Sequence, residues 1–403
     1  MADDRILKQK NVVLCVTGGI AAYKAIELAR LLQKAGALVD VVMTEAATRF
    51  VAPLTFQALM HRPVILDMFA LLRDMEIGHV ALADRADAIV VAPATANTIA
   101  KLALGLADNM VTSTVLAAGC PVIVAPAMEE KMWRNEATQA NVSRLEDRGF
   151  HIVAPDEGPL ASGKIGAGRL APVQRIAGCV RYVMSRSGPL TGKNILVTAG
   201  GTREPIDPVR FITNRSSGKM GYAVAQAALD AGAEVNLVTA VTNLEPPYGA
   251  ETTQVTTALE MREAVLSLLP QADALVMAAA VADYRVASPA AQKMKKTGSE
   301  WVLTLVQNPD IAAEVGAKRP PRLRAFVGFA AETEDVIENA RVKMRTKGMD
   351  LIVANDVSSP DSGFEVDSNR VSFLDLNGGV EHLPLLPKRE VAERLVARIA
   401  KLL

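Results

Sequence analysis

The sequence predicts an α/β protein with two doubly wound, parallel-sheet domains. Short runs rich in Val, Ile and Ala alternate with segments of helical apolar periodicity, which is the pattern of repeated βαβ units. A glycine turn, Gly18-Gly19, follows the first apolar run. The pattern restarts after residue 193, and its first run is again followed by a glycine turn, Gly200-Gly201.

In the first half, residues 11–17 predict a buried strand, residues 20–35 a helix that Gly36 ends, and residues 38–43 a second strand. The glycine turn therefore lies at the carboxyl end of the first strand, where ligands bind in parallel sheets. The remaining elements expected in this half are strands at 88–92 and 122–125 and a helix at 96–107.

A polar, turn-rich segment at 185–193 predicts a linker, which gives domains at residues 1–188 and 189–403. Residues 202–218 form an insertion between the second glycine turn and the next helix, at the edge where ligands bind. The elements expected around this insertion are strands at 194–198 and 235–239 and a helix at 219–231. A later strand that opens with Ala-Asp-Ala is repeated at 86–92 and 272–278.

Composition and charge exclude several classes of function. The 403 residues include 44 basic and 44 acidic side chains, and this zero net charge disfavours a nucleic-acid-binding protein. No run approaches the roughly 20 apolar residues of a membrane-spanning helix, and we expect no secretion signal. The three cysteines have no paired spacing, which disfavours disulfides and predicts a cytoplasmic protein.

Neither glycine turn has the G-x-G-x-x-G spacing of a dinucleotide-binding loop. No acidic residue ends the second strand, since Asp40 precedes its core, so a nicotinamide-dependent oxidoreductase is a disfavoured alternative. Gly218-Lys219-Met220 lacks the Ser or Thr that follows Lys in a P-loop. Both turns still offer backbone amides at a helix N-terminus, which is a weak signal for a phosphate-binding site.

Longer motifs give a more specific signal. In the first half, the motifs TGGIAAYK, GHV, APATAN and APAM begin at residues 17, 78, 92 and 125, and they resemble the FMN-dependent cysteine decarboxylases. The second half resembles the phosphopantothenate–cysteine ligases in the motifs TAGGTREPIDPVR, NRSSGKMG, AAVADY, KMKK, NPDI and GFAAET, which begin at 198, 214, 279, 293, 308 and 328. Residues 9–400 as a whole resemble the bacterial bifunctional enzymes of coenzyme A biosynthesis that combine both activities.

The resemblance implies a Rossmann-like, flavodoxin-like first half that binds FMN and decarboxylates phosphopantothenoylcysteine to 4′-phosphopantetheine. It implies a second half that joins 4′-phosphopantothenate to L-cysteine with CTP and Mg²⁺, by way of an acyl-cytidylate. It also implies a homo-oligomer, with trimeric contacts in the first half and dimeric contacts in the second. No residues are assigned to the magnesium ion.

In the ligase half, a bound triphosphate requires concentrated positive charge. Lys343 and Lys347 share one face of a predicted helix, and Lys293, Lys295 and Lys296 lie in a predicted loop. The resemblance implies that Lys293, Lys343 and Lys347 contact the nucleotide. It further implies that Lys293 promotes the second step, in which a cation stabilises an oxyanion.

Other residues of the second half are also assigned by the resemblance. Asn214, in the insertion, is implied to help form the acyl-cytidylate, and the guanidinium of Arg210 to bind the intermediate. Asn308-Pro309 equally fits an ordinary helix start, with Asn308 as N-cap and Pro309 in the first turn. The resemblance places the following residues beside CTP: Met277, Ala278, Ala279, Asp283, Pro309, Asp310, Ile311 and Phe329.

In the first half, loss of carbon dioxide needs an electron sink, which a flavin supplies by oxidising the cysteine thiol to a thioaldehyde. A lone histidine is as a rule structural, but the motif around His79 resembles that of the catalytic histidine. An imidazole titrates near neutrality, which suits proton transfer with the thiol. The segments that resemble flavin contacts include Gly18, Gly19, Thr44, Thr95 and Asn97.

Two positions depart from the family pattern. Glu129 stands where relatives commonly have an asparagine that donates hydrogen bonds to the substrate carboxylate, and an ionised glutamate only accepts them. Ser162 stands where relatives have a cysteine that donates a proton, and a serine hydroxyl is far less acidic. We expect both to act in an altered but working site, with Glu129 sharing a proton with the substrate carboxylate. The alternative is an active ligase whose first half binds flavin or assembles the oligomer without catalysis.

Overall fold

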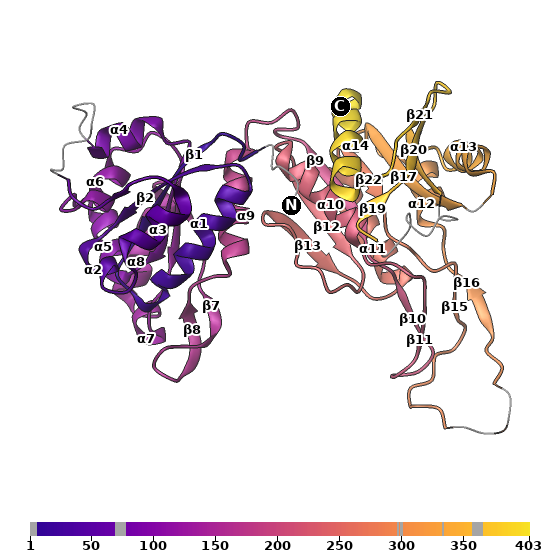
Figure 1. Cartoon of the computed structure of the whole chain (residues 1–403). Coiled ribbons are helices and arrows are strands. Elements are labelled where there is room, and N and C mark those ends of the chain that lie inside the picture. Colours follow the sequence, from indigo (N-terminus) through magenta and orange to yellow (C-terminus); the bar gives the residue numbers. More distant parts are fainter. Residues whose placement is uncertain (1–5, 69–77, 296–297, 299–300, 333, 357–365) are drawn as a thin grey trace. The chain divides into compact units, whose positions relative to one another are not determined.

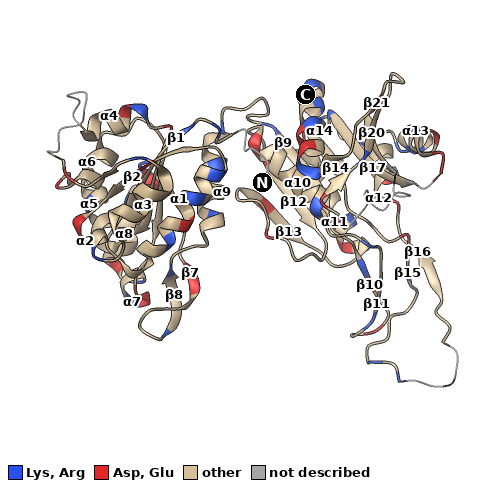
Figure 2. Ribbon diagram, viewed as in Figure 1, with Lys and Arg blue, Asp and Glu red and all other residues tan. Residues whose placement is uncertain are grey.

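The computed structural model describes residues 6–68, 78–295, 298, 301–332, 334–356 and 366–403. The chain forms two compact units, Met1–Ser185 and Arg186–Leu403, which are described separately (Figure 1). Each unit contains one largely parallel sheet with helices on both faces, which confirms the predicted fold class. Basic and acidic residues are interspersed along the ribbon of both units (Figure 2).

The sheet of the first unit has six parallel strands in the order β3-β2-β1-β4-β5-β6 among the described residues. The strand order reverses direction between β1 and β4, and doubly wound sheets form their ligand crevice at this point. The strands are β1 (Asn11–Val16), β2 (Leu38–Met43), β3 (Val64–Ile65), β4 (Ala88–Ala94), β5 (Val122–Pro126) and β6 (His151–Ile152).

Helices bury both faces of this sheet because their apolar residues recur at helical spacing. One face is covered by α1 (Lys24–Lys34), α3 (Pro53–Met60) and α9 (Val173–Met184). The other face and its apolar core are covered by α4 (Gly78–Arg85), α5 (Ala96–Leu104), α6 (Met110–Leu116) and α8 (Glu136–Asp147). The remaining elements are a 3₁₀ helix (Ile20–Tyr23), α2 (Glu45–Thr48), α7 (Glu130–Trp133) and the hairpin of β7 (Asp156–Pro159) and β8 (Ile165–Arg169).

The sheet of the second unit has eight strands in the order β13-β12-β9-β14-β17-β18-β20-β21 in the described part of the chain. Strands as far as β18 are parallel, and β20 and β21 extend the edge in antiparallel fashion. The strands are β9 (Asn194–Ala199), β12 (Glu234–Thr239), β13 (Ala250–Gln254), β14 (Ala274–Met277), β17 (Ala325–Glu332), β18 (Leu351–Asp356), β20 (Val371–Asp375) and β21 (Val380–His382).

Helices α10 (Lys219–Asp230) and α14 (Lys388–Leu402) pack together beside this sheet. The apolar core on the other face includes residues of α11 (Ala258–Leu268), α12 (Ile311–Ala317) and α13 (Val336–Thr346). Two arms project from the carboxyl edge, and Figure 1 shows them extending from the same side of the unit. They are the hairpin of β10 (Arg203–Pro205) and β11 (Phe211–Thr213) and the hairpin of β15 (Tyr284–Val286) and β16 (Leu305–Gln307). The short elements left are a 3₁₀ helix (Leu269–Gln271) and the pair β19 (Ser368–Asn369) and β22 (Leu386–Pro387).

The predicted strands are confirmed with shifts of one or two residues at their ends, but two of the predicted helices differ. The helix predicted at 20–35 divides into a 3₁₀ turn and α1. The helix predicted at 96–107 ends at Leu104, because Gly105 takes a left-handed φ of 72° that terminates it. The insertion at 202–218 contains the β10–β11 arm.

The repeated Ala-Asp-Ala motif makes the same contact in both units. The carboxylate of Asp87 accepts a hydrogen bond from the N–H of Asn11 at 2.8 Å, and that of Asp273 from the N–H of Asn194 at 2.8 Å. Each aspartate also donates its own N–H to the carbonyl of the same asparagine, at 2.8 Å in both cases. These paired bonds fix the register of the first strand against the fourth at the amino edge of each sheet.

The carboxyl groups of Asp87 and Asp273 both have a pKa below the ordinary value. Burial raises the pKa of Asp87, but the hydrogen bonds from Asn11 and Lys10 outweigh this effect and hold the pKa below its ordinary value. Burial likewise raises the pKa of Asp273, and the bonds from Asn194 and Arg322 outweigh it. The ionised carboxylates are therefore the forms that stabilise the folded state.

We predict that Asp87→Asn lowers the free energy of unfolding by about 1 kcal/mol at neutral pH, because a charged acceptor is exchanged for a neutral one. The folded pKa of Asp87 is depressed, so its stabilisation is present above the unfolded value of about 3.9 and is lost as the pH falls toward the folded pKa. Urea unfolding measured from pH 7 to pH 3 should therefore show that the free energy of unfolding falls less with acid in the variant than in the parent. Parallel curves for variant and parent would contradict this account.

Candidate functional site

A large pocket of about 1290 Å³ opens at the carboxyl edge of the first sheet. Thr17, which is buried just beyond the end of β1, holds together two of the loops that border this pocket. The Thr17 hydroxyl donates to the carbonyl oxygen of Pro93 at 2.6 Å and accepts from the N–H of Thr95 at 3.1 Å. The loops that follow β1 and β4 therefore lie side by side at the point where the strand order reverses.

The glycine turn is required by close packing. A Cβ atom on Gly18 would lie 2.4 Å from the Cβ of Ala46 in α2, so any larger residue would push the turn away. Thr44 caps α2 through a hydrogen bond from Ala47 N–H, and Thr95 caps α5 through one from Thr98 N–H. These caps place the starts of both helices at the pocket.

The pocket brings together most of the residues predicted for the first site. Seven of them line it: Gly18, Gly19, Thr44, Thr95, Asn97, Glu129 and Ser162. His79 does not line it. Helix α4, which carries His79, lies at the top of the unit in Figure 1, whereas α7 and the β7–β8 hairpin beside the pocket lie at the bottom. The His79 Nδ1 atom is buried and has no hydrogen-bond partner in the described part of the chain.

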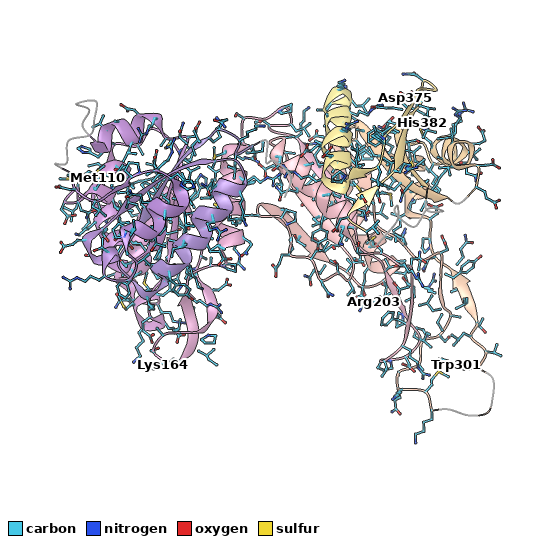
Figure 3. All side chains as sticks on the ribbon, in the orientation of Figure 1. Met110, Lys164, Arg203, Trp301, Asp375 and His382 are labelled. Atoms are coloured by element: carbon cyan, nitrogen blue, oxygen red, sulfur yellow. The ribbon has the colours of Figure 1, made fainter. Side chains whose placement is uncertain are left out.

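The two departures from the family pattern are in direct contact. The Ser162 hydroxyl donates to Glu129 Oε2 at 2.8 Å, and the Lys164 ammonium lies 4.0 Å from Glu129 Oε1. Lys164 is at the tip of the β7–β8 hairpin (Figure 3). Gly168 makes this approach possible, because its carbonyl accepts from Met128 N–H at 2.9 Å and a Cβ would lie 2.2 Å from the Met128 oxygen. The hairpin thus lies directly against the segment that carries Glu129.

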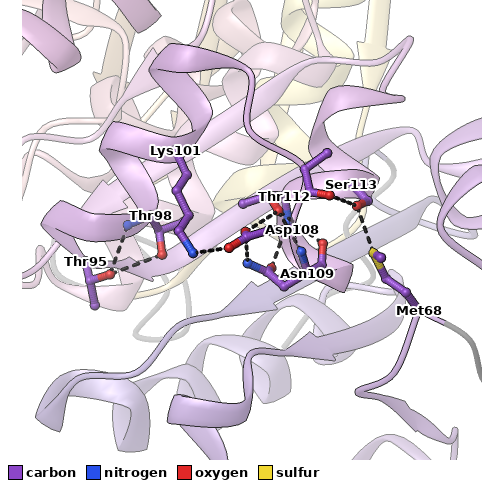
Figure 4. Close-up of polar contacts among 9 residues, drawn as sticks. Met68, Thr95, Thr98, Lys101, Asp108, Asn109, Thr112 and Ser113 are labelled. Atoms are coloured by element: carbon purple, nitrogen blue, oxygen red, sulfur yellow. Dashed lines mark hydrogen bonds and ion pairs between the residues drawn. The ribbon is translucent and has the colours of Figure 1, made fainter.

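Several charged residues of this pocket were missed by sequence reasoning. Lys101 and Asp108 form an ion pair at 2.5 Å, and Asn109 donates to Asp108 at 2.9 Å (Figure 4). The N-x-x-T spacing of Asn109 and Thr112 is the signal that could have identified this helix start, since the two residues form a capping box for α6. The hydrogen bond from Lys101 lowers the pKa of Asp108 and outweighs the effect of burial.

Two basic residues with no role predicted from the sequence also line the pocket, although one of them, Lys24, ends the TGGIAAYK motif. Lys24 and Arg169 lie 145 positions apart in sequence, on α1 and β8, and both border the cavity. Burial lowers the pKa of Lys24, and the nearby charge of Arg169 lowers it further. Two like charges at one wall favour an anionic group between them.

A smaller pocket of about 190 Å³ lies at the carboxyl ends of β14 and β17 in the second unit. Thr198, buried near the end of β9, accepts a hydrogen bond from the N–H of Ala279 at 3.2 Å. This contact repeats the role of Thr17 in the first unit. Nine residues predicted to bind the nucleotide line the pocket: Met277, Ala279, Asp283, Pro309, Asp310, Ile311, Phe329, Lys343 and Lys347.

The charges in this second pocket are partly paired. Lys347 forms an ion pair with Asp310 at 2.9 Å, and the Lys343 ammonium donates to the carbonyl oxygen of Phe329 at 3.3 Å. Burial raises the pKa of Asp310, but its bonds to Lys347 and to the N–H of Ala313 outweigh this and lower the pKa. Both lysines lie near the end of α13 and face the same cavity.

The alternative interpretation of Asn308 as a helix N-cap is wrong. Asp310 caps α12, through a hydrogen bond from Ala313 N–H at 3.0 Å. The buried Asn308 amide instead donates to the carbonyl of Ala282 at 2.8 Å and accepts from Arg285 at 3.1 Å. It therefore joins the chain before α12 to the chain after β14.

Four other predicted residues do not line the pocket: Ala278, Lys293, Asn214 and Arg210. Asn214 is close to it, because its amide donates to the carbonyl of the lining residue Val281 at 3.1 Å. Arg210 is bound to Asp207 and to the carbonyl of Met294. Lys296, which the sequence places with Lys293, lies outside the described residues.

Among the residues that the structure describes, no three His, Cys, Asp or Glu side chains are grouped so that they could hold a metal ion. No described helix has the length and apolar character needed to cross a bilayer.

Comparison with known proteins identifies the family. Residues 2–185 match the family described as Flavoprotein, and residues 190–403 match the DNA/pantothenate metabolism flavoprotein C-terminal domain. The chain is 46% identical to the coenzyme A biosynthesis bifunctional protein CoaBC of Bacillus subtilis (strain 168), over 98% of both chains. It is also 46% identical to CoaBC of Mycobacterium bovis, over 98% of this chain and 97% of that one.

The chain belongs to the CoaBC family of bifunctional coenzyme A biosynthesis proteins. This confirms the prediction of a bifunctional enzyme of that pathway. Among solved structures, the chain is similar to the C-terminal domain of a CoaBC protein, with 42% identity, a TM-score of 0.46 and coverage of 53% of this chain and 97% of that one. It is also similar to a PPC decarboxylase mutant complexed with pantothenoylaminoethenethiol, with 31% identity, a TM-score of 0.40 and coverage of 43% and 97%.

Proposed function

We propose that this CoaBC protein joins 4′-phosphopantothenate to L-cysteine in its second unit and decarboxylates the product in its first. The observation that carries the ligase assignment is the pocket that gathers Lys343, Lys347 and Asp283 with six other predicted nucleotide-binding residues. We further propose that the protein acts in the cytoplasm and forms homo-oligomers, trimeric through the first unit and dimeric through the second.

CTP is the proposed nucleotide in the second unit. Lys343 and Lys347 offer ammonium groups to its phosphates, and the apolar side chains of Met277, Ile311 and Phe329 provide surface for its base. Mg²⁺ is proposed to arrive with the nucleotide, since magnesium is commonly held by phosphates and one or two carboxylates. Asp283 fits that role better than Asp310, which is already paired with Lys347.

The ligase residues then act in two steps. The phosphopantothenate carboxylate attacks the α-phosphorus of CTP, a new bond to oxygen forms, and pyrophosphate leaves. Asn214 is proposed to orient the acyl-cytidylate, since its amide lies against the pocket residue Val281. Cysteine then attacks the acyl carbon, CMP leaves, and the ammonium of Lys293 stabilises the oxyanion formed in between.

FMN is the proposed cofactor of the first unit, and the residues present fit it. The pocket has apolar surface for a ring system, including Met128, Met132 and Leu160. The glycine turn and the start of α5 offer backbone amides for a phosphate, and Lys24 with Arg169 provides a further anionic position. When bound, FMN supplies the electron sink that decarboxylation needs.

His79 is proposed to act in the pocket of a neighbouring copy. In one chain it does not line the pocket, although its motif resembles that of a catalytic histidine. A trimer of the first unit can bring α4 of one copy against the open pocket of the next, because heterologous contacts close into a ring. There the imidazole can exchange a proton with the substrate thiol.

Purified protein tests these proposals together. We expect yellow colour with a flavin spectrum, pyrophosphate release that requires CTP and phosphopantothenate, and carbon dioxide release once cysteine is added. Rates with ATP equal to those with CTP would contradict the cytidine assignment. Flavin binding without carbon dioxide release would favour the alternative, in which the first half does not catalyse.

We predict that Lys293→Gln slows amide formation on the order of 100-fold, because a neutral amide replaces the cation that faces the oxyanion. Pyrophosphate release should be partly retained, since the first step precedes this role. Rapid-quench measurement of both products resolves the two steps. Amide formation at the parental rate would show that Lys293 has no part in the reaction.

We predict that decarboxylation persists in the parent and depends on a proton at Glu129. Two carboxylates in one pocket repel, so the bound substrate and Glu129 should share a proton, which lets Glu129 donate as an asparagine would. Glu129→Gln can donate a hydrogen bond at every pH. The variant should therefore stay active, and its rate should fall less than that of the parent as the pH becomes alkaline. Glu129→Asp should be slower because its reach is shorter, and Glu129→Ala slower still. Carbon dioxide release across pH decides this, and an Ala variant as active as the parent would rule the role out.

We predict that His79→Asn and the double variant Glu129→Ala, Ser162→Ala restore each other when co-expressed. Each homotrimer lacks an intact site, but a mixed ring in which sites are shared between neighbours has one intact site, which amounts to about a quarter of all sites in a random equal mixture. Carbon dioxide release by the co-purified mixture is the measurement. A mixture no more active than its separate parts would place His79 outside the neighbour's pocket.

A further inference from the structure

One buried carboxylate ties together the two arms of the second unit. Asp207 lies in the turn between β10 and β11, and none of its side chain is exposed. It accepts hydrogen bonds from the N–H groups of Val209 and Arg210, both at 2.9 Å. It also accepts one at 3.2 Å from the N–H of Met294, which lies in the connection between β15 and β16.

The guanidinium of Arg210 completes this contact. Its Nε donates to Asp207 Oδ2 at 2.9 Å, and its Nη2 donates to the carbonyl oxygen of Met294 at 2.8 Å. The guanidinium also lies over the ring of Trp301, 4.4 Å from its centre, and Figure 3 shows Trp301 on the arm. Both polar backbone groups of Met294 are therefore bound by one ion pair. We call Asp207, Arg210, Met294 and Trp301 the arm clasp.

The charge state of Asp207 supports this arrangement. The hydrogen bond from Arg210 lowers the pKa of its carboxyl group far below the usual range and outweighs the effect of burial. The carboxylate therefore remains ionised at every pH at which the protein would work. A second bond between the arms, from Ala290 N–H to the carbonyl of Ile206 at 2.9 Å, lies next to the clasp.

The arm clasp binds the backbone of Met294, which is the residue next to Lys293. The Lys293 side chain is exposed, and no hydrogen bond or ion pair joins its ammonium to another described side chain. The arm that carries it begins just after Asp283 and ends just before Asn308, and both of these line the nucleotide pocket. Fixing the backbone of Met294 thus fixes the base of the Lys293 side chain relative to that pocket.

We propose that Asp207 is a positioning residue for the ligase, which acts through Arg210 and the Met294 backbone to hold Lys293 for the second step. In that step the cysteine nitrogen bonds to the acyl carbon, the bond from that carbon to the CMP oxygen breaks, and the amine loses a proton to solvent. The inference rests on the proposed function and assigns Arg210 to the clasp in place of binding the intermediate. Ordering Lys293 beforehand reduces the entropy lost when the oxyanion forms.

The test compares Asp207→Asn with Asp273→Asn in the full-length protein. Asp273 is a matched control, because it also accepts a backbone N–H and a guanidinium but lies at the opposite, amino edge of the sheet. In Asp207→Asn we expect amide formation to slow on the order of 10- to 100-fold, with pyrophosphate release within about threefold of the parent. In Asp273→Asn we expect the ratio of the two rates to stay at the parental value. Equal ratios in all three proteins would overturn the proposal.

Double variants separate positioning from simple stabilisation. If Asp207 acts through Lys293, the pair Asp207→Asn, Lys293→Gln should be no slower in amide formation than Lys293→Gln alone. Additive losses would overturn the proposal and leave the role of Lys293 intact. An unaffected Lys293→Gln would instead overturn that part of the proposed function. Hydrogen exchange at residues 287–295 should rise in Asp207→Asn and not in Asp273→Asn.

A milder variant keeps the test decisive if Asp207→Asn does not fold. Trp301→Leu removes the ring beneath the Arg210 guanidinium and leaves every hydrogen bond of Asp207 in place. We expect it to slow amide formation by a smaller factor in the same direction, with pyrophosphate release unchanged. A Trp301→Leu protein with parental rates in both steps would overturn the proposal.

Discussion

A buried threonine at the end of the first strand shapes the ligand-binding edge in both units. Thr17 holds the loop after β4, and Thr198 holds Ala279 after β14. The first pocket opens where the strand order reverses, between β1 and β4, whereas the second lies one strand further along, at the carboxyl ends of β14 and β17. At the opposite edge, Asp87 and Asp273 fix the register of the same strands. A slip at either end would displace both loops of the pocket together, because parallel strands transmit a register shift along their whole length.

The parts of the fold that the sequence predicts are those that depend on local pattern. Apolar runs signal the strands β1, β2, β4, β5, β9, β12 and β14, and glycine turns follow the ends of β1 and β9. The β7–β8 hairpin was not predicted, because Asp156–Pro159 and Ile165–Arg169 are short, exposed and rich in glycine. Such strands are specified by a long-range contact, here that of Gly168 with Met128, which no local period encodes.

The residues of the candidate sites also fall into those that local spacing predicts and those that only the folded chain brings together. Lys343 and Lys347 could be placed together from helical spacing, and the structure shows both at one cavity. The contact of Asp207 with Met294 joins residues 87 positions apart, and Lys24 and Arg169, which line the same cavity, lie still further apart in sequence. The contact of Arg210 with Asp207 is local but was not predicted, because strand and helix periodicity do not describe pairing within a turn. The role of Arg210 at the intermediate stays a prediction.

Glu129 and Ser162, the two positions at which the sequence departs from the pattern that it resembles, are joined by a hydrogen bond. A serine alone would be a poor proton donor, and a glutamate alone would place an unpaired carboxylate beside an anionic substrate. Side by side, the hydroxyl satisfies the carboxylate at 2.8 Å, and Lys164 lies 4.0 Å away on the same hairpin. A hydrogen-bonded carboxyl and hydroxyl can pass a proton along one line, which neither group could do alone. In the proposed decarboxylase site the two residues would therefore act as one hydrogen-bonded pair, which the β7–β8 hairpin brings together.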